Sequence, residues 1–506
     1  MSVADVWAGR AGTPLPPRTI QSPLDGRELH ALPQSSGEDV DAAFAAARIA
    51  GHEWAQRSFA ERRALLLRAH DLVLERAEEL GEIARHETGK TRGQALEEVL
   101  IAASSTRYNA LSAHRVLRAQ RRRAGLPFIT RTTVRFQPKG VVGVITPWNY
   151  PLSLTALDVI AALAAGNAVV QKIDEQGAWS ALALRRAFID AGLPEHVWIV
   201  VAGAAAVVGE RLTDLADYIC FTGSTATGRH IAQKAGSRLV GASLELGGKN
   251  ALIVLNDVDP GRAAEHARYA CFAAMGQLCV SAERIYVHRD VADEFQEALV
   301  AAASDARLGA APDADFGTLT SAAQVERVQA HLDDALSKGA SVLVGGSRRP
   351  DLGPYAFEPT ILTGVTPDMH CYADETFGAL AALHIVDSED EAIALANASD
   401  YGLNAAVLSG STARARAVAA RLQAGTVNIN EGYRASFSAV DAPMGGVKQS
   451  GVGRRNGAEG LLRFVEPITI AWTTGVLRLP SSAADFARLG GLMLFAMRVL
   501  KALRIR

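Results

Sequence analysis

The stretch VVGVITPWNYPLSLTALDVIAALAAGNAVVQK, residues 141–172, places a long apolar segment between two short runs rich in β-branched residues. The runs VVGVIT (141–146) and AVVQK (168–172) predict buried strands, and the segment between them predicts a helix. Strands that run in the same direction need such a crossover connection. Two further runs, WIVVAG (198–203) and YICFTG (218–223), follow after helical segments. The stretch therefore predicts a parallel α/β sheet covered by helices.

The segments on either side of this sheet follow different patterns. Upstream, ALLLRAHDLVLERAEEL (64–80) carries one apolar stripe at steps of three and four, which predicts a helix. The stripe consists of Leu66, Ala69, Val73, Ala77 and Leu80. Downstream, NALIVL (250–255) and ERIYVH (283–288) belong to a second alternating region that runs to about residue 444. We therefore expect two α/β domains that join near residues 246–250.

Composition restricts the classes of protein that fit. A chain of 506 residues that is 49% hydrophobic and 21% charged is typical of a globular protein of two or three domains. The net charge of -2 argues against a general nucleic-acid binder. The four cysteines are irregularly spaced without a CxxC pair, so we expect neither a disulfide framework nor a metal site. The N-terminus has no apolar leader, which makes the cytoplasm the expected location.

Unusual residues follow the predicted strands, where ligands of parallel sheets bind. The loops are TPWNYP (146–151), QKIDE (171–175), FTGSTATG (221–228) and LELGGKN (244–250). The GSTATG turn lacks the lysine and the hydroxyl that a phosphate-binding P-loop needs after its last glycine. The helix that follows it could still offer amides to a phosphate, although a plain strand-to-helix turn has the same pattern.

Cys279 lies in the segment AMGQLCVSAER (274–284), among small residues and far from any second thiol. A lone cysteine is most often a small buried apolar residue. A nucleophilic cysteine also needs a base for its second half-reaction. Glu245 is a candidate base because a carboxylate is costly to bury in an apolar, glycine-rich segment. The alternative is a salt-bridged glutamate at a strand end.

Six motifs together resemble the aldehyde dehydrogenase superfamily. They are TPWNYP, FTGSTATG, LELGGKN, GQLC, DETFG and GGVKQSGVGR, and they occur in the family's order from about residue 20 to 471. Within the superfamily the chain is most similar to bacterial succinate-semialdehyde dehydrogenases. The resemblance implies two Rossmann-type α/β domains and a β oligomerisation arm. It divides the chain into a cofactor domain (1–119 and 139–247), a catalytic domain (248–449), an oligomerisation element (120–138 and 465–476) and a basic amphipathic extension (477–506).

The resemblance also implies catalytic roles. The thiolate of Cys279 attacks the aldehyde carbon, and the Asn149 amide with the Cys279 backbone N–H holds the resulting oxyanion. Loss of a hydride then leaves a thioester. Glu245, which precedes Cys279 by 34 positions, activates the water that hydrolyses this thioester to a carboxylic acid.

The same resemblance implies the cofactor contacts. NAD is the expected cofactor, with NADP as the alternative, because a carboxylate at Glu175 accepts ribose hydroxyls and repels a 2'-phosphate. The loop reads KIDE where relatives often read KPSE, which weakens this preference. The expected cofactor-binding residues are Ile145, Thr146, Pro147, Trp148, Lys172, Glu175, Gly223, Ser224, Gly228, Leu246, Glu375 and Phe377.

The substrate is less well defined by the resemblance. Succinate-semialdehyde enzymes commonly place arginines where this chain has Leu157 and Ala273. A buried carboxylate without a cation is poorly bound. Either another residue holds it, with Arg434 and Ser438 as candidates, or the substrate is less polar.

Three alternatives and two partners complete the expectations. The substrate can be another aliphatic or aromatic aldehyde, or a coenzyme A thiol can replace water, although Glu245 opposes the latter. A non-catalytic dinucleotide-binding or membrane-associated scaffold is the alternative from another class. The expected partners are a small aldehyde and further copies of the chain, as a homodimer or homotetramer, because the arm exposes a strand edge. The basic C-terminal extension permits contact with a membrane surface, and no nucleic acid is expected.

Overall fold

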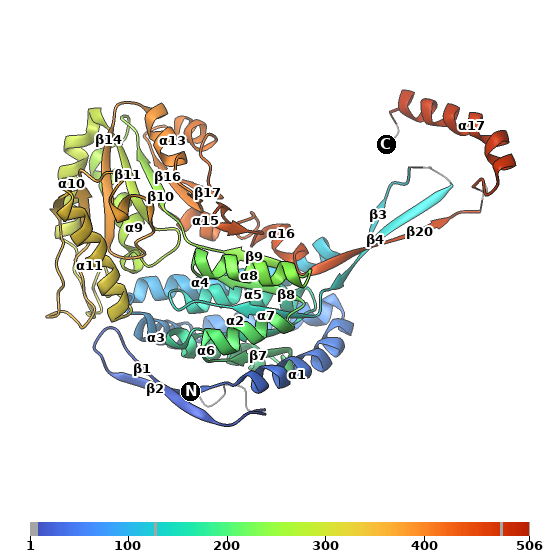
Figure 1. Cartoon of the computed structure of the whole chain (residues 1–506), viewed down its shortest axis with the longest axis horizontal. Coiled ribbons are helices and arrows are strands. Elements are labelled where there is room, and N and C mark those ends of the chain that lie inside the picture. Colours follow the sequence, from blue (N-terminus) through green and yellow to red (C-terminus); the bar gives the residue numbers. More distant parts are fainter. Residues whose placement is uncertain (1–8, 126–128, 476–478, 505–506) are drawn as a thin grey trace.

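A computed structural model describes residues 9–125, 129–475 and 479–504. Two α/β bodies lie side by side, and a long β arm leaves them and carries the C-terminal helix (Figure 1). The chain is thus an α/β protein with two separate sheets, as the sequence predicts, and each sheet is parallel except for one antiparallel edge strand.

The first sheet has six strands in the order β19-β9-β8-β5-β6-β7. All four strands that the sequence predicts are present and parallel, and they are β5 (Val141–Ile145), β6 (Ala168–Lys172), β7 (Trp198–Val201) and β8 (Tyr218–Thr222). Strand β9 (Gly241–Glu245) adds a fifth parallel strand, and β19 (Gly451–Val452) returns late in the chain to pair antiparallel with it. The crossover helices are α5 (Pro151–Ala164), α6 (Ala178–Asp190), α7 (Glu210–Leu215) and α8 (Thr225–Ser237).

Helix α5 is buried over its whole length. It packs against α2 and α4 of the N-terminal helical layer as well as against its own sheet. A helix that is covered on all sides has no polar face, which explains why its sequence is apolar throughout.

The N-terminal part of the chain forms four helices, and the first of them packs with α7 on the face of the first sheet opposite to the other three, which cover α5 and α6. They are α1 (Gly37–Gln56), α2 (Phe59–Glu75), α3 (Ala77–Thr88) and α4 (Arg92–Leu117). The single helix expected over residues 64–80 is wrong in one respect, because Arg76 leaves the helical region between α2 and α3. The apolar stripe continues across this break, since Val73 and Leu80 are both buried. A hairpin of β1 (Leu15–Gln21) and β2 (Glu28–Gln34) precedes these helices.

The second sheet has seven strands in the order β12-β13-β14-β11-β10-β16-β17. Its strands are β10 (Asn250–Val254), β11 (Ala282–His288), β12 (Ser341–Val344), β13 (Thr360–Thr363), β14 (Leu380–Val386), β16 (Asn404–Leu408) and β17 (Thr426–Ile429). Only the edge strand β12 pairs antiparallel within this sheet, because the other pairs are parallel. The helices that belong to it are α9 (Pro260–Phe272), α10 (Ala292–Ser304), α11 (Ala322–Ser337), α12 (His370–Ala373), α13 (Glu389–Asn397) and α14 (Thr412–Ala419).

Short elements connect the second body back to the first. They are the pair β15 (Tyr401–Gly402) and β18 (Val447–Lys448), with α15 (Arg434–Ser438) and α16 (Gly457–Leu462). Through β19 and α16 the late part of the chain returns to the first sheet and its helices.

The arm is a three-stranded antiparallel sheet in the order β20-β4-β3. Strand β4 (Thr130–Pro138) pairs along its full length with β20 (Val465–Thr473), while β3 (Gln120–Arg122) covers part of its other edge. The residues expected to form a β arm, 120–138 and 465–476, thus contain its three strands, although residues 126–128 and 476 lie outside the described residues. The arm extends far from both α/β bodies (Figure 1).

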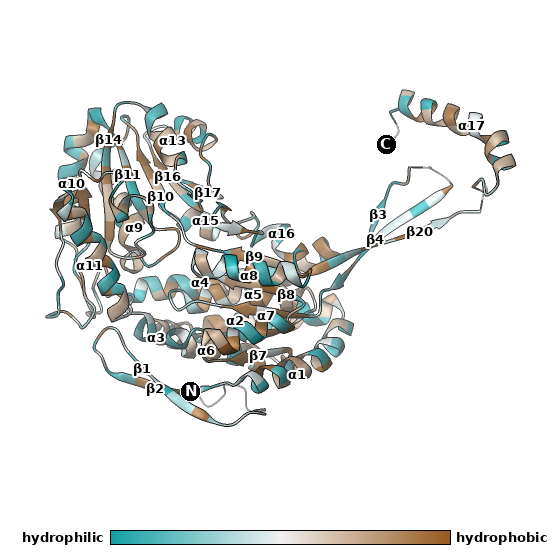
Figure 2. Cartoon of the chain, in the orientation of Figure 1, coloured by the Kyte–Doolittle hydropathy of each residue, from teal (hydrophilic) through white to brown (hydrophobic). Residues whose placement is uncertain are grey.

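Helix α17 (Ala483–Ala502) lies beyond the arm and has no buried residue. Apolar and polar residues alternate along it (Figure 2). No helix within residues 9–125, 129–475 and 479–504 is long and apolar enough to cross a membrane.

Candidate active site

A cavity of about 700 Å³ lies where strands of the first sheet end and the second body begins. The first body contributes the loop after β5, the turn after β8 and the end of β9. From these segments the predicted residues Pro147, Trp148, Asn149, Gly223, Ser224, Glu245 and Leu246 line the cavity. The second body contributes Cys279, Glu375 and Phe377. Residues that are up to 230 positions apart in the sequence therefore meet in one space. The first body contributes segments at the carboxyl ends of its parallel strands, whereas the second body contributes the segments that precede β11 and β14.

The loop that carries Cys279 has an unusual backbone. Ala274, Met275 and Gly276 all have positive φ angles, of 48°, 57° and 72°. A side chain at Gly276 would collide with the carbonyl oxygen of Gly378, so glycine is required by the close approach of two backbones. Non-glycine residues in this region store strain of about 1 kcal/mol or more each, which is common at functional sites.

Hydrogen bonds from the second sheet hold this loop in place. The Asn250 side-chain amide donates to the carbonyl oxygens of Cys279, at 2.8 Å, and of Ser281, at 2.7 Å. Asn250 begins β10, so the position of the thiol is fixed by a regular strand.

The Cys279 thiol is free and half-buried. Burial raises its pKa to about 12, and the carboxyls of Glu245 and Glu375 act in the same direction. The Arg455 guanidinium opposes this shift but does not cancel it. In the protein alone the thiol is therefore protonated at neutral pH. A cation bound in the cavity would favour the thiolate, because an opposite charge stabilises the ionised form.

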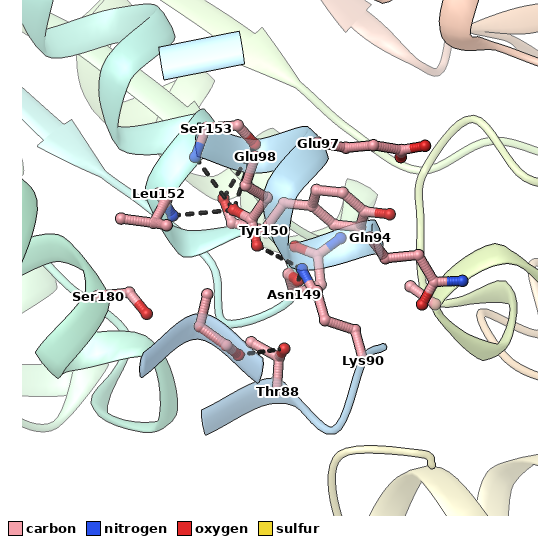
Figure 3. Close-up of polar contacts among 12 residues, drawn as sticks. Thr88, Lys90, Gln94, Glu97, Glu98, Asn149, Tyr150, Leu152, Ser153 and Ser180 are labelled. Atoms are coloured by element: carbon pink, nitrogen blue, oxygen red, sulfur yellow. Dashed lines mark hydrogen bonds and ion pairs between the residues drawn. The ribbon is translucent and has the colours of Figure 1, made fainter. Parts of the chain in front are cut away.

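Asn149 is held from two sides. Its side-chain nitrogen donates to the carbonyl oxygen of Gln277 at 2.8 Å, on the loop of Cys279. An amide nitrogen has two hydrogens, so one remains for another acceptor. The Lys90 ammonium donates to the Asn149 backbone carbonyl at 2.8 Å (Figure 3).

Lys90 belongs to a buried ion pair that was not predicted. Its partner is Glu98, and both side chains are at most 1% exposed. The other oxygen of Glu98 accepts the backbone N–H groups of Leu152, at 2.9 Å, and Ser153, at 3.1 Å, at the start of α5 (Figure 3). A carboxylate at a helix N-terminus is electrostatically favourable. The ion pair of Lys90 and Glu98 thus connects helix α4 and the first turn of α5 to the loop that carries Asn149. Lys90 follows Gly89 between two helices, and nothing in the local pattern separates it from an exposed lysine.

Glu245 ends β9 and is 4% exposed. Its Oε1 atom has no hydrogen-bond partner among the described residues. Burial raises the pKa of this carboxyl to about 7, while Arg455 acts in the opposite direction. Arg455 itself is held by Asp158 through two hydrogen bonds of 2.9 and 2.6 Å. A carboxyl that titrates near neutral pH and has an unused acceptor is suited to take a proton from water.

The turn after β8 fits a phosphate. Ser224 caps α8, with its hydroxyl accepting the Thr227 N–H at 3.3 Å, and the first helical residues Thr225 and Ala226 line the cavity. The N-terminus of a helix attracts anions through its free amides and its dipole.

The segment of Glu375 and Phe377 forms the opposite wall. The carboxyl of Glu375 accepts the Gly248 N–H at 2.8 Å, and burial raises its pKa to about 8. Phe377 has a φ of 55°, and its ring meets that of Trp148 edge to face with 5.7 Å between centroids. Glu283, paired with Lys249, accepts the Phe377 N–H at 2.9 Å and so fixes this segment.

Other predicted cofactor residues lie outside the cavity wall. Ile145 ends β5 and Thr146 follows it, and the Thr146 hydroxyl accepts a hydrogen bond from Gln171 at 3.0 Å. Lys172 is buried at the end of β6. Gly228 lies within α8, and a side chain there would collide with Leu246.

Glu175 follows β6 and forms an ion pair with Arg18 at 2.6 Å. Arg18 lies in the N-terminal hairpin and is 64% exposed, whereas Glu175 is 14% exposed. Arg18 is 157 positions away from Glu175 in the sequence, so no local pattern indicates this neighbour. A cation beside the carboxylate reduces its repulsion of an added phosphate.

The two predicted substrate anchors bind other parts of the protein. Arg434 donates to Glu431 at 2.7 and 3.1 Å, and its guanidinium lies over the ring of Tyr269 at 4.2 Å. The Ser438 hydroxyl donates to the Ala435 carbonyl at 2.9 Å. Neither residue lines the cavity.

Comparison with known proteins agrees with this geometry. Residues 16–470 match the model of the aldehyde dehydrogenase family. Proteins of Mycolicibacterium smegmatis and Mycobacterium tuberculosis are 49% and 48% identical to the chain, and their names provisionally describe NADP+-dependent succinate-semialdehyde dehydrogenases. These alignments cover 91% and 90% of this chain and 90% and 88% of the relatives.

Solved structures are also similar to the chain. A betaine aldehyde dehydrogenase of Staphylococcus aureus with bound NAD+ has a TM-score of 0.87 and 31% identity, and the match covers 92% of this chain and 94% of that one. An NADP-dependent enzyme of Escherichia coli has a TM-score of 0.86 and 34% identity, and the match covers 90% and 95%. From the matching family model, the mycobacterial relatives and the shared fold, the chain belongs to the aldehyde dehydrogenase family.

Proposed function

We propose that the chain oxidises an aldehyde to a carboxylic acid with a nicotinamide dinucleotide. The observation that carries this proposal is the meeting of Cys279, Asn149 and Glu245 in one cavity. A thiol, an amide donor and a carboxyl that titrates near pH 7 are the groups that this oxidation requires.

Residues of the chain carry out the attack on the aldehyde, the stabilisation of the oxyanion and the hydrolysis of the thioester. The Cys279 thiolate bonds to the aldehyde carbon, and the remaining N–H of Asn149 stabilises the oxygen that becomes negative. When bound, the nicotinamide ring accepts the hydride that this carbon loses. Glu245 then takes a proton from a water molecule, whose oxygen attacks the thioester and releases the acid and the Cys279 thiolate.

The cavity wall supports binding of the dinucleotide. The α8 N-terminus suits the pyrophosphate, and Glu375 offers a carboxyl to ribose hydroxyls. We propose that the chain uses NAD or NADP. Glu175 favours NAD, whereas Arg18 beside it and the NADP+ in the names of the mycobacterial relatives support NADP.

The test is an assay of reduced cofactor. Purified protein is given short aliphatic, aromatic and ω-carboxylate aldehydes with each cofactor, and the acid product is identified by mass spectrometry. Cys279→Ala is the control and should be inactive. If no aldehyde reduces either cofactor, or if Cys279→Ala keeps full activity, the proposal is wrong and a non-catalytic role gains support.

We propose that the arm assembles the chain into a homodimer or homotetramer. Among the described residues, strand β20 pairs with β4 on one side and has no partner strand on the other. Ile468, Ile470 and Trp472 of β20 are 36%, 42% and 47% exposed. An apolar edge strand is a template for pairing with another chain. Light scattering after size exclusion should give at least twice the mass of one chain, and a monomer would contradict the proposal.

We also propose that α17 contacts a membrane surface without crossing it. The helix exposes Phe486, Leu492 and Phe495, which are 57%, 64% and 62% exposed, and carries cations such as Arg498 and Lys501. Such a helix binds anionic lipid through burial of its apolar residues and through charge. Full-length protein should float with vesicles that contain phosphatidylglycerol, and protein truncated after Gly475 should not. Equal flotation of both would contradict the proposal.

The cytoplasm remains our proposed location. All four cysteines are free thiols, which is usual in a reducing compartment. Fractionation of cells that express a tagged chain tests this, and recovery from an oxidising compartment would contradict it.

A further inference from the structure

Cys279 also adjoins a group of apolar and aromatic side chains. Cys279 packs against a buried cluster that includes Tyr150, Leu154, Leu157, Tyr433 and Phe437. These side chains are 1%–6% exposed. The cluster contains Leu157, one of the two positions where the resemblance to succinate-semialdehyde dehydrogenases implies an arginine.

The substituent of the aldehyde has to lie near this cluster. Ser224, Glu375 and Phe377 define the part of the cavity that suits the dinucleotide. The hydride leaves the aldehyde carbon toward that part. The remaining carbon chain of the thiohemiacetal therefore extends toward Leu154, the buried member of the cluster that lines the cavity, where apolar contact removes it from water.

The charged side chain that contacts this cluster is the carboxylate of Glu97. Glu97 of α4 accepts hydrogen bonds from the hydroxyls of Tyr269, at 2.7 Å, and Tyr433, at 3.0 Å. Each phenol uses a different oxygen of the carboxylate, and the two rings stack with 6.1 Å between centroids. Burial raises the pKa of both phenols, so they remain O–H donors. Two donors on two oxygens match an ionised carboxylate.

The nearby cations are already paired. Arg434 binds Glu431 and covers the outer ring, that of Tyr269. The Lys90 ammonium lies 3.6 Å from the centre of the Tyr150 ring, but it is bound to Glu98 and to the Asn149 carbonyl. A substrate carboxylate would thus meet a like charge and would have to break an existing ion pair to gain a partner.

We propose that the preferred aldehyde has an uncharged, apolar substituent, and that Glu97 acts as a specificity residue against aldehydes with a distal carboxylate. The proposal rests on the aldehyde oxidation proposed above. It separates this chain from the activity in the names of its mycobacterial relatives, because succinate semialdehyde carries such a carboxylate.

Three substrates of similar length test the proposal. They are succinate semialdehyde, its methyl ester, which lacks the charge, and pentanal. We expect kcat/KM for the ester and for pentanal to exceed that for succinate semialdehyde by at least about tenfold. Equal or faster oxidation of succinate semialdehyde would overturn the proposal while leaving aldehyde oxidation intact. If none of the three is oxidised, the proposed function itself fails.

A variant tests the role of Glu97. Glu97→Gln keeps the size of the side chain and one acceptor oxygen but removes the charge. We expect the ratio of kcat/KM for succinate semialdehyde to that for its methyl ester to rise about tenfold, mainly through KM, and to depend less on salt. Glu75→Gln at the exposed end of α2 is the matched control and should leave the ratio unchanged. An unchanged ratio in folded Glu97→Gln would overturn the role of Glu97.

Discussion

The ammonium of Lys90 donates a 2.8 Å hydrogen bond to the backbone carbonyl of Asn149 inside the protein. The same ammonium pairs with Glu98, whose second oxygen binds the first amides of α5. The ion pair therefore acts on the side-chain amide of Asn149 through the backbone. Lys90 and Glu98 are positioning residues in this arrangement, because neither lines the cavity.

Loss of the Lys90–Glu98 ion pair should lower kcat more than it weakens cofactor binding. Lys90→Met alone leaves Glu98 buried without a partner, which typically costs about 3–5 kcal/mol. Lys90→Met with Glu98→Gln avoids the unpaired charge and keeps an acceptor at α5. We expect this double variant to melt near the wild type and to lose roughly 10- to 100-fold in kcat, with KM for the cofactor little changed. Wild-type kcat in the folded double variant would contradict the positioning role.

The reactivity of Cys279 should depend on the cofactor. Because burial raises its pKa to about 12, alkylation by iodoacetamide should rise roughly tenfold per pH unit between pH 7 and 10 in the protein alone. Addition of NAD+ should accelerate the reaction at pH 7.5. Peptide mass spectrometry measures the site, and Cys279→Ala gives the background from the buried Cys220, Cys271 and Cys371. A plateau below pH 9 without cofactor would contradict the prediction.

Removal of the Glu245 carboxylate should stop the second half of the reaction. Glu245→Gln should release about one equivalent of reduced cofactor per site in a burst and then turn over about 100-fold or more slowly. The acyl group should appear as added mass on Cys279. In the wild type, kcat should rise as pH increases through about 7, because the carboxyl has to lose its proton to act as a base. A variant that turns over at the wild-type rate, with no adduct, would exclude this role.

Arg18 should influence the choice of cofactor. Arg18→Ala removes the cation beside Glu175, so we expect the ratio of kcat/KM for NADP to that for NAD to fall about tenfold. Glu175→Gln should raise the same ratio. Arg27→Ala, which removes an exposed cation next to the same hairpin, is the control. Melting temperatures should stay close to the wild type because exposed ion pairs contribute little to stability. If the ratio of kcat/KM for NADP to that for NAD is unchanged in both Arg18→Ala and Glu175→Gln, another residue determines whether a 2'-phosphate is accepted.

Much of the site was already accessible from local sequence. The strands β5, β6, β7 and β8 alternate with helices, and this pattern depends only on the burial of β-branched runs along the chain. In contrast to the strands and helices, the ion pairs of the site depend on how segments that are distant in the sequence pack against each other. Arg434 was a reasonable substrate anchor in the sequence, yet it lies in contact with Glu431 and Tyr269. The break at Arg76 was equally hidden, because the apolar stripe continues across it.

The sequence by itself determined the parallel α/β architecture and the family, and it identified Cys279, Asn149 and Glu245 as candidate catalytic residues. Sequence motifs and the periodicity of apolar residues are local properties, so they can be recognised without the tertiary structure. Only the tertiary structure decided which charges face each other. The pKa of Glu245 depends on its burial and on Arg455, which is 210 positions away. The environment of the aldehyde depends on Glu97 meeting Tyr269 and Tyr433 across three segments. Electrostatic energy follows distance in space and exclusion of water, and neither can be read from neighbours in the sequence.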